Sequence, residues 1–326
     1  GILALAGLGT NSAGGNVGIT STNVTTSGDN SLGIGALAYD NVTINSGSVS
    51  TSGANALGIY AGSYYGDINV TSNSVATTGA SASGIFTLAY DGNTVVNSGT
   101  VTTTGADATG INAQGAGNVT ISSTSVITSG DNATGIDVTA TGGNATVTSG
   151  SVRTSGDYTY GIDVYAFNGN INVTSNSVAT TGYVAGGIST TSIFGNTTIT
   201  SGSVSTADDY SDGINAFAYT GNVAITSTGP VSTAGYASDG IDVFTYYGDA
   251  QVANSGAVTT AGNASTAIEA QAYGSGNVVI SNSAALRTGG ANSHGIYASS
   301  EAGNVQISGT GTIVTTGAGS RGIEAY

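Results

Sequence analysis

Acidic side chains recur at matching places along the chain, 26 or 27 residues apart. Asp137 and Asp163 form one such pair, and Asp242 and Glu269 form another. Like charges on adjacent strands repel each other by about 1 kcal/mol even in water, and a Ca²⁺ ion held between them would remove that repulsion. The chain has no Gly-Gly-x-Gly-x-Asp calcium-binding nonapeptide. We therefore expect a solvated acidic stripe and no cofactor, with Ca²⁺ as the alternative.

The same carboxylates raise the question of hydrolysis, because retaining glycosidases use two carboxyl groups about 5 Å apart. Asp137 and Asp163 would meet that separation on neighbouring strands, but strand spacing alone produces it. The single histidine, His294, falls in a polar loop, where we expect it to be exposed. Because no nucleophile and base come together in the sequence, we expect a protein that is not an enzyme, with polysaccharide cleavage as an alternative.

Aromatic side chains are distributed unevenly and could bind a partner. Of the 22 aromatic residues, fourteen fall at alternate, outward places of one recurring segment or at the corner that follows it. They are Tyr39, Tyr60, Tyr64, Phe86, Tyr90, Tyr165, Phe167, Phe217, Tyr219, Phe244, Tyr246, Tyr273, Tyr297 and Tyr326. Exposed rings combine apolar area with a polar group, which is typical of surfaces that contact sugars or proteins. The alternative is that the loop before the recurring segment folds over these rings and hides them.

The segments that must position these residues form a repeat. The dipeptide Gly-Ile returns from Gly1-Ile2 to Gly322-Ile323, and after the first interval its spacing is 25 to 28 residues. Only Ile268 follows another residue, Ala267. A repeat of this length predicts stacked units in one continuous domain, residues 1–326. We expect residues 1–15 to form an irregular first coil, because the link from Leu8 to Gly14 is longer than elsewhere.

Each repeat predicts three short strands. The segment that begins at Gly-Ile alternates with period two, as in residues 214–218, so its small apolar side chains share one face. A Gly-Asn corner follows, then a second strand such as residues 42–46, then a third of the form Val-x-Thr. The predicted fold is all-β, a three-sided parallel β-helix with about 12 coils of about 26 residues and right-handed coiling.

The corner after the first strand carries a column of asparagines. Glycine and asparagine tolerate left-handed backbone, so we expect that conformation at this corner. Stacked asparagine side chains can also hydrogen-bond along the axis as a ladder. The predicted ladder comprises Asn41, Asn93, Asn118, Asn144, Asn170, Asn196, Asn222, Asn277 and Asn304.

Composition limits the partners. The chain has 18 acidic residues against three basic ones, which argues against a basic surface for nucleic acid. It contains no cysteine, and no apolar run is long enough to span a bilayer as a helix. Because it begins without methionine or a signal-like segment, we expect a fragment of a longer protein whose targeting segments lie outside it.

The motif from Asn41 to Ala61, Asn-Val-Thr-Ile-x-Ser-Gly-x-Val-x-Thr-x-Gly-x-x-Ala-x-Gly-Ile-x-Ala, resembles the repetitive passenger regions of bacterial type V autotransporters and large surface adhesins. The resemblance covers nearly the whole chain, and no catalytic residue carries over with it. It implies an acidic, cysteine-poor rod displayed at the bacterial cell surface or secreted, often as an adhesin or as part of a fibre.

We therefore expect an extracellular structural or adhesive rod. Its aromatic face would contact a cell-surface glycan, a protein, or a second copy of the chain, either laterally or end to end. One alternative is a β-helix that binds or cleaves polysaccharide. Another is an ice-binding solenoid, because outward Ser and Thr side chains such as Thr102 and Thr104 recur in the third strands, although Arg153 and Arg287 interrupt that rank.

Overall fold

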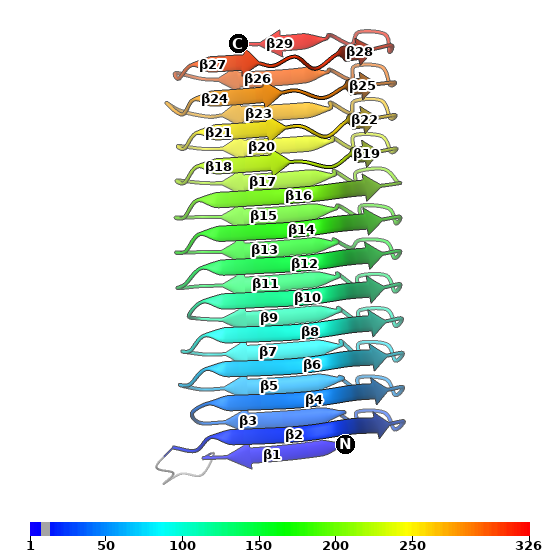
Figure 1. Ribbon diagram of the computed structural model, residues 1–326, viewed down its shortest axis with the longest axis vertical. Coiled ribbons are helices and arrows are strands. Elements are labelled where there is room, and N and C mark those ends of the chain that lie inside the picture. The colour runs from blue at the N-terminus through cyan, green and yellow to red at the C-terminus, as the bar shows by residue number, and fades with distance from the viewer. Residues whose placement is uncertain (8–13) are drawn as a thin grey trace.

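The structure, a computed structural model, describes residues 1–7 and 14–326, and in these residues all regular secondary structure is β-strand. The strands pair in parallel and stack into an upright rod of about twelve coils (Figure 1). The predicted parallel β-helix is therefore confirmed. Most of the link predicted from Leu8 to Gly14 lies outside the described residues, whereas the first strand pairs in register with the next one above it.

Thirteen short strands form the first sheet, and sixteen strands form the second. The first sheet comprises β1 (Ile2–Ala6), β3 (Ile34–Ala38), β5 (Ile59–Ser63), β7 (Ile85–Ala89), β9 (Ile111–Gly115), β11 (Ile136–Ala140), β13 (Ile162–Ala166), β15 (Ile188–Ser192), β17 (Ile214–Ala218), β20 (Ile241–Thr245), β23 (Ile268–Ala272), β26 (Ile296–Ser300) and β29 (Ile323–Ala325). In the second sheet, eight long strands are β2 (Val17–Thr26), β4 (Val42–Thr51), β6 (Ile68–Thr77), β8 (Thr94–Thr103), β10 (Val119–Thr128), β12 (Ala145–Thr154), β14 (Ile171–Thr180) and β16 (Thr197–Thr206). The remaining strands are the pairs β18 (Val223–Ser227) and β19 (Val231–Thr233), β21 (Ala250–Asn254) and β22 (Val258–Thr260), β24 (Val278–Asn282) and β25 (Leu286–Thr288), and β27 (Val305–Ser308) and β28 (Ile313–Thr315).

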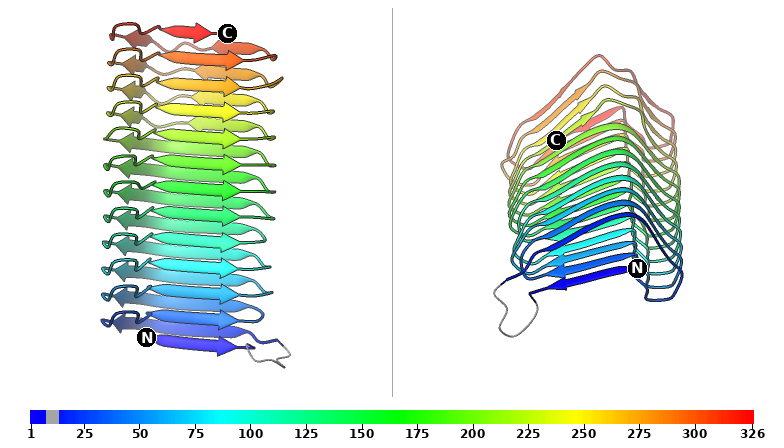
Figure 2. Two further views of the ribbon diagram at one scale, coloured as in Figure 1. Left: turned by 180° about the vertical axis from the view of Figure 1, so that it is seen from behind. Right: turned by 60° about the horizontal axis from the view of Figure 1, so that its bottom comes forward.

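Each coil has three faces. In the first eight coils a short strand forms one face, and a single long strand of the second sheet forms the other two. The predicted second and third strands run on as one ten-residue strand that bends near its middle (Figure 2). From β18 onward one extra residue stands between the two stretches, as at Gly229-Pro230, and the strand divides there. Proline has no N–H to donate to the next coil. The added residue also explains why the Gly-Ile spacing lengthens toward the C-terminus.

The coil is right-handed. In Figure 1 the long strands cross from left to right in front of the short strands, which return from right to left while the chain rises. The same arrangement appears from behind in Figure 2, where the short strands lie in front.

The interior is a column of isoleucine, valine and small residues. Each Gly-Ile isoleucine pairs with the equivalent residue of the next coil, as Ile136 does with Ile162, and both are fully buried. Glycine precedes isoleucine because a Cβ at Gly161 would lie 2.3 Å from Cγ1 of Val178. Where Ala267 replaces this glycine, the hydrogen bond from Ile268 N to Gly295 O of the next coil lengthens to 3.2 Å. The repeat thus specifies both core packing and backbone approach.

The invariant threonine of the third strand closes the loop that follows it. In most coils its hydroxyl donates to the carbonyl oxygen five residues later, as from Thr51 to Ala56 and from Thr103 to Ala108, each at 2.5 Å. Thr154 differs, because its hydroxyl accepts a hydrogen bond of 3.3 Å from Thr159 Oγ1. A valine of similar shape would leave that carbonyl without this partner. The hydroxyl is therefore the reason that this inward position is threonine.

The left-handed residue of each coil lies in the loop before Gly-Ile and not at the asparagine corner. One residue per loop has a φ near +50°, for example Asn55, Tyr158 and Val184. The column residues from Asn16 to Asn304 have no positive φ, so the prediction for that corner is wrong. A β-branched residue such as Val184 rarely adopts this conformation. Here its N–H donates 3.0 Å to Asp209 O of the next coil, which holds the turn in register.

The asparagine column forms a continuous hydrogen-bonded ladder at the other corner. Each Oδ1 accepts the backbone N–H of the equivalent residue one coil above, as from Asn170 N to Asn144 Oδ1 at 2.8 Å. The same contact runs unbroken from Asn16 to Asn304 through Asp67 and Asp249. At this corner the side-chain oxygen therefore accepts a hydrogen bond from a backbone N–H that lies outside the strands.

Candidate binding surface

Outward side chains of the first sheet stack into columns along the rod, because its strands pair without a shift in register. Two columns come from the second and fourth residues of the short strands. A third, which we call the corner column, comes from the residue directly after each short strand from β3 to β23 and reads Tyr39, Tyr64, Tyr90, Ala116, Thr141, Phe167, Ile193, Tyr219, Tyr246 and Tyr273. The rod thus carries a ridge of rings along one edge of the sheet.

The structure divides the fourteen predicted aromatic residues between these columns. Tyr60, Phe86, Tyr165, Phe217, Phe244 and Tyr297 occupy outward strand places and are half-buried, and Tyr326 follows the last strand. The other seven lie in the corner column, and the most exposed of them are Tyr90 at 58%, Tyr273 at 52%, Tyr64 at 42%, Phe167 at 40% and Tyr219 at 38%. The loop before Gly-Ile does not hide these five rings.

The rings contact their neighbours in adjacent coils. Tyr64 and Tyr90 stack with centroids 5.4 Å apart and an interplanar angle of 11°. Beside them Tyr60 and Phe86 stack at 5.8 Å and 7°. Parallel strands are about 4.8 Å apart, so the strand spacing itself brings rings in one column to stacking distance. Farther along the rod Phe167 contacts Phe194, and a separate group links Tyr219, Tyr246 and Tyr273. Tyr297 contacts Tyr326 and His294 instead.

Sequence reasoning missed a second aromatic column in the loops before Gly-Ile. Tyr158, Tyr183, Tyr210 and Tyr236 contact one another edge to face at 5.6, 5.9 and 5.5 Å. The available signal was a tyrosine four or five residues before the isoleucine in four successive repeats. It was missed because the loop varies in composition from one coil to the next. These rings lie at the other end of the short strands from the corner column.

The acidic pairs lie on neighbouring strands as the repeat requires. Asp137 pairs in register with Asp163, and Asp242 pairs with Glu269. Asp212 and Asp239 lie beside the second pair, where Asp239 N donates 2.8 Å to Asp212 Oδ1. We call Asp212, Asp239, Asp242 and Glu269 the acidic quartet. Asn215 Nδ2 bridges two of its members, at 3.2 Å from Asp212 Oδ2 and 3.1 Å from Asp242 Oδ2.

Burial makes these carboxyl groups hard to ionise. It raises the pKa of Asp137 to about 6, and the charge of Asp163 adds to the effect. Within the quartet, burial and, to a smaller extent, the charges of the neighbouring carboxylates together raise the pKa of Asp239 and of Asp242 to about 8. Burial also raises the pKa values of Asp212 and Glu269. The predicted solvated stripe is therefore wrong for these residues, which lie half-buried between outward side chains of the first sheet.

The described residues contain no group of three or more His, Asp or Glu side chains placed to hold one metal ion. Calcium therefore stays a prediction for the pairs Asp137–Asp163 and Asp242–Glu269. His294 is not the exposed residue that we predicted: its side chain is 19% exposed and its Nε2 lies 3.5 Å from Glu324 Oε2. Its Nδ1 accepts a hydrogen bond from Arg321 N at 3.2 Å, which gives the imidazole a structural role.

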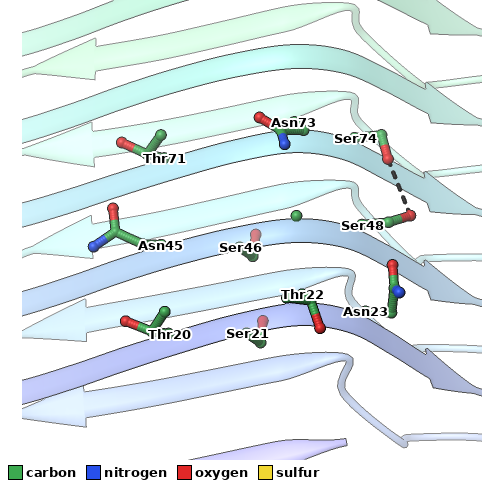
Figure 3. Close-up of a pocket in the computed structure, with 11 residues that line it drawn as sticks. Thr20, Ser21, Thr22, Asn23, Asn45, Ser46, Ser48, Thr71, Asn73 and Ser74 are labelled. Atoms are coloured by element: carbon green, nitrogen blue, oxygen red, sulfur yellow. Dashed lines mark hydrogen bonds between the residues drawn. The ribbon is translucent and has the colours of Figure 1, made fainter.

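A groove of about 560 Å³ lies at the bend of the second sheet (Figure 3). Its lining from β2, β4 and β6 consists of serine, threonine, asparagine and Gly47. A Cβ at Gly47 would lie 2.2 Å from Thr22 O, so the bend excludes a side chain there and leaves the hollow. Ser74 Oγ donates 3.1 Å to Ser48 Oγ across its edge. The lining offers neutral hydroxyl and amide groups, without a ring or a charge.

The fold and its stacked columns define a β-solenoid repeat protein. No known protein family, characterised protein or solved structure matches this chain in sequence or structure. Among residues 1–7 and 14–326 there is no helix with the length and apolar character needed to cross a membrane.

Proposed function

We propose that this chain is an extracellular structural and adhesive rod, a segment of a secreted bacterial solenoid of the autotransporter-passenger type. Its role is to hold a ring-bearing surface away from the cell and to contact a glycan or a protein there. The net charge of −15 disfavours nucleic acid and anionic membrane as partners.

The observation that carries the proposal is the exposed corner column. Rings at Tyr64, Tyr90, Phe167, Tyr219 and Tyr273 are 38 to 58% exposed along one edge of the sheet. Large rings at such exposure are costly in a secreted protein unless a partner covers them, because exposed apolar patches promote association. The second sheet, by contrast, presents mainly Ser, Thr and Asn at its outward places. Contact is therefore concentrated on one side of the rod.

Adhesion of coated beads tests this role. The chain is fixed to beads, and attachment is measured on films of mucin and of fibronectin and between the beads themselves. Serine at the five exposed corner-column positions should reduce attachment several-fold. The control variant carries alanine at five outward threonines of the second sheet, Thr71, Thr148, Thr174, Thr200 and Thr226. Equal attachment of the two variants, or none by the unmodified chain, would refute the proposal.

Negative-stain microscopy separates adhesion from self-assembly. Single unbranched rods that attach to mucin or fibronectin indicate adhesion to another molecule. Paired or bundled rods that separate in the serine variant indicate that the column packs against a second copy. The complete reading frame tests the secreted context, because an extracellular rod requires a secretion signal in the full protein.

A further inference from the structure

The corner column carries small side chains in two successive coils, those of β9 and β11. Ala116 and Thr141 stand there between Tyr90 below and Phe167 above. A cavity of about 160 Å³ opens at this place, lined by Leu88, Ala89, Tyr90, Gln114, Gly115, Ala116, Thr139 and Thr141. We call it the notch. Three strand spacings of about 4.8 Å separate the coils of Tyr90 and Phe167, which leaves room for a ring beside Tyr90.

The lower wall of the notch offers an aromatic face. Tyr64 stacks on one side of the Tyr90 ring at 5.4 Å. The next coil places Ala116 where the following ring would stand, so the other side of Tyr90 faces the gap. Tyr90 is 58% exposed. A ring-shaped ligand can therefore continue the stack, in the position that an aromatic side chain fills elsewhere in the column.

The floor beside the notch is a chain of planar polar groups. Gln114 Nε2 donates 3.0 Å to Asn112 Oδ1, and Asn112 Nδ2 donates 2.9 Å to Asp137 Oδ2. Each amide nitrogen donates in this chain, and this fixes the orientation of both amides. Gln114 lines the notch, and its Oε1 can accept a hydrogen bond there. A ligand that satisfies this oxygen must carry a donor.

We propose that the notch binds one pyranose ring of an extracellular glycan, stacked on Tyr90, with a hydroxyl group donating to Oε1 of Gln114. This proposal rests on the adhesive role and names its ligand class. A pyranose combines an apolar C–H face for the ring with hydroxyl donors for the floor. A phenylalanine side chain from a protein would instead bury Oε1 of Gln114 without a donor, which is unfavourable.

Filling the notch with the column's own residue type is the sharpest test. Ala116→Tyr places a ring where the stack predicts one, so the rod should stay folded while the ligand position is occupied. Tyr90→Ala and Gln114→Ala remove the stacking face and one acceptor. Thr148→Tyr is the matched control, because it adds the same side chain to an exposed outward place of β12.

The probe is an array of immobilised oligosaccharides, followed by calorimetric titration of the tightest binder. We expect Ala116→Tyr to abolish binding, and Tyr90→Ala and Gln114→Ala each to weaken it about tenfold. Thr148→Tyr should bind within about twofold of the unmodified chain, and melting temperatures should confirm that all variants fold. Binding that survives Ala116→Tyr, or an array without any binder, would overturn the notch as a sugar site.

The bead assay distinguishes this failure from failure of the adhesive role. If beads attach through the corner column but no oligosaccharide binds, the rod is an adhesin for a protein and only the notch proposal is wrong. If Ala116→Tyr lowers bead attachment without any oligosaccharide binding, the notch has a protein ligand, which also overturns the pyranose. Loss of both readouts in the unmodified chain refutes the adhesive role itself.

Discussion

The acidic quartet should make the rod less stable as the pH rises, and Asp242→Asn should remove much of that loss. Asp242 pairs in register with Asn215 below it and Glu269 above it. Asparagine has nearly the same shape and keeps an oxygen to accept the 3.1 Å hydrogen bond from Asn215 Nδ2. The substitution therefore removes a charge while leaving the local packing unchanged.

The sign follows from proton binding. The pKa of Asp242 is about 8 in the folded rod and about 3.9 in an unfolded chain. Between these values the folded state binds more protons, so its stability falls with rising pH. The contribution is complete below about pH 4 and is lost as the pH passes 8. Four pKa units at about 1.4 kcal/mol each set an upper bound of about 5.6 kcal/mol. Partial exposure and sharing of the repulsion with Asp239 and Glu269 reduce the expected effect to about 2 kcal/mol.

Thermal unfolding at pH 4.5 and pH 9 measures this effect. The unmodified chain should melt at a lower temperature at pH 9, and Asp242→Asn should melt above it at pH 9 and close to it at pH 4.5. Asp131→Asn is the control, because it makes the same chemical change at an exposed loop residue and keeps the oxygen that accepts Asp157 N. The argument fails if both asparagine variants shift equally at pH 9, since the effect would then reflect net charge alone. It also fails if Asp242→Asn is destabilising at that pH.

Two further predictions concern the ladder and calcium. Asn144→Ala should lower the free energy of unfolding by about 1 kcal/mol, because Asn170 N loses its acceptor. Asn144→Asp should cost less than half as much, because aspartate keeps the oxygen and already occupies that column at Asp67 and Asp249. Urea titration measures both variants, and equal losses would contradict the role of Oδ1. Melting temperatures in excess Ca²⁺ and in excess chelator should agree, because in residues 1–7 and 14–326 no three acidic or histidine side chains are placed to hold one metal ion. A clear rise with Ca²⁺ would show that a metal ion neutralises one of the acidic pairs.

The fold could be predicted because two periods agree in the sequence. Alternation with period two identifies the inward face of each short strand, and the 25- to 28-residue repeat returns the same inward residue, as with Ile136 and Ile162. Parallel pairing in register is the only arrangement that satisfies both. The asparagine column could be read for the same reason, since a repeated side chain at one corner must meet its own copy in the next coil.

What could not be predicted depends on backbone geometry within the turns. Asparagine and glycine tolerate left-handed backbone, so the Gly-Asn corner seemed to require it, yet the left-handed residue is one such as Val184 or Ala237 in the opposite loop. Stacking imposes this conformation, because each of these residues donates its N–H to the coil above. The raised pKa of Asp242 could not be predicted either, because the sequence shows which residues carry charge but not how far the neighbouring side chains bury them.

The outward rings and the buried core of this rod can change independently, because they lie on different faces of the same coil. Residues 68–79 and 171–182 are identical in sequence and form β6 and β14 of the second sheet with the loops that follow. The short strands that precede them present different outward groups, Tyr60 and Tyr64 in one coil and Tyr165 and Phe167 in the other. Inward residues of both short strands are equally buried. An outward ring can therefore change without altering the core, so the order of rings along the corner column can vary while the fold stays constant.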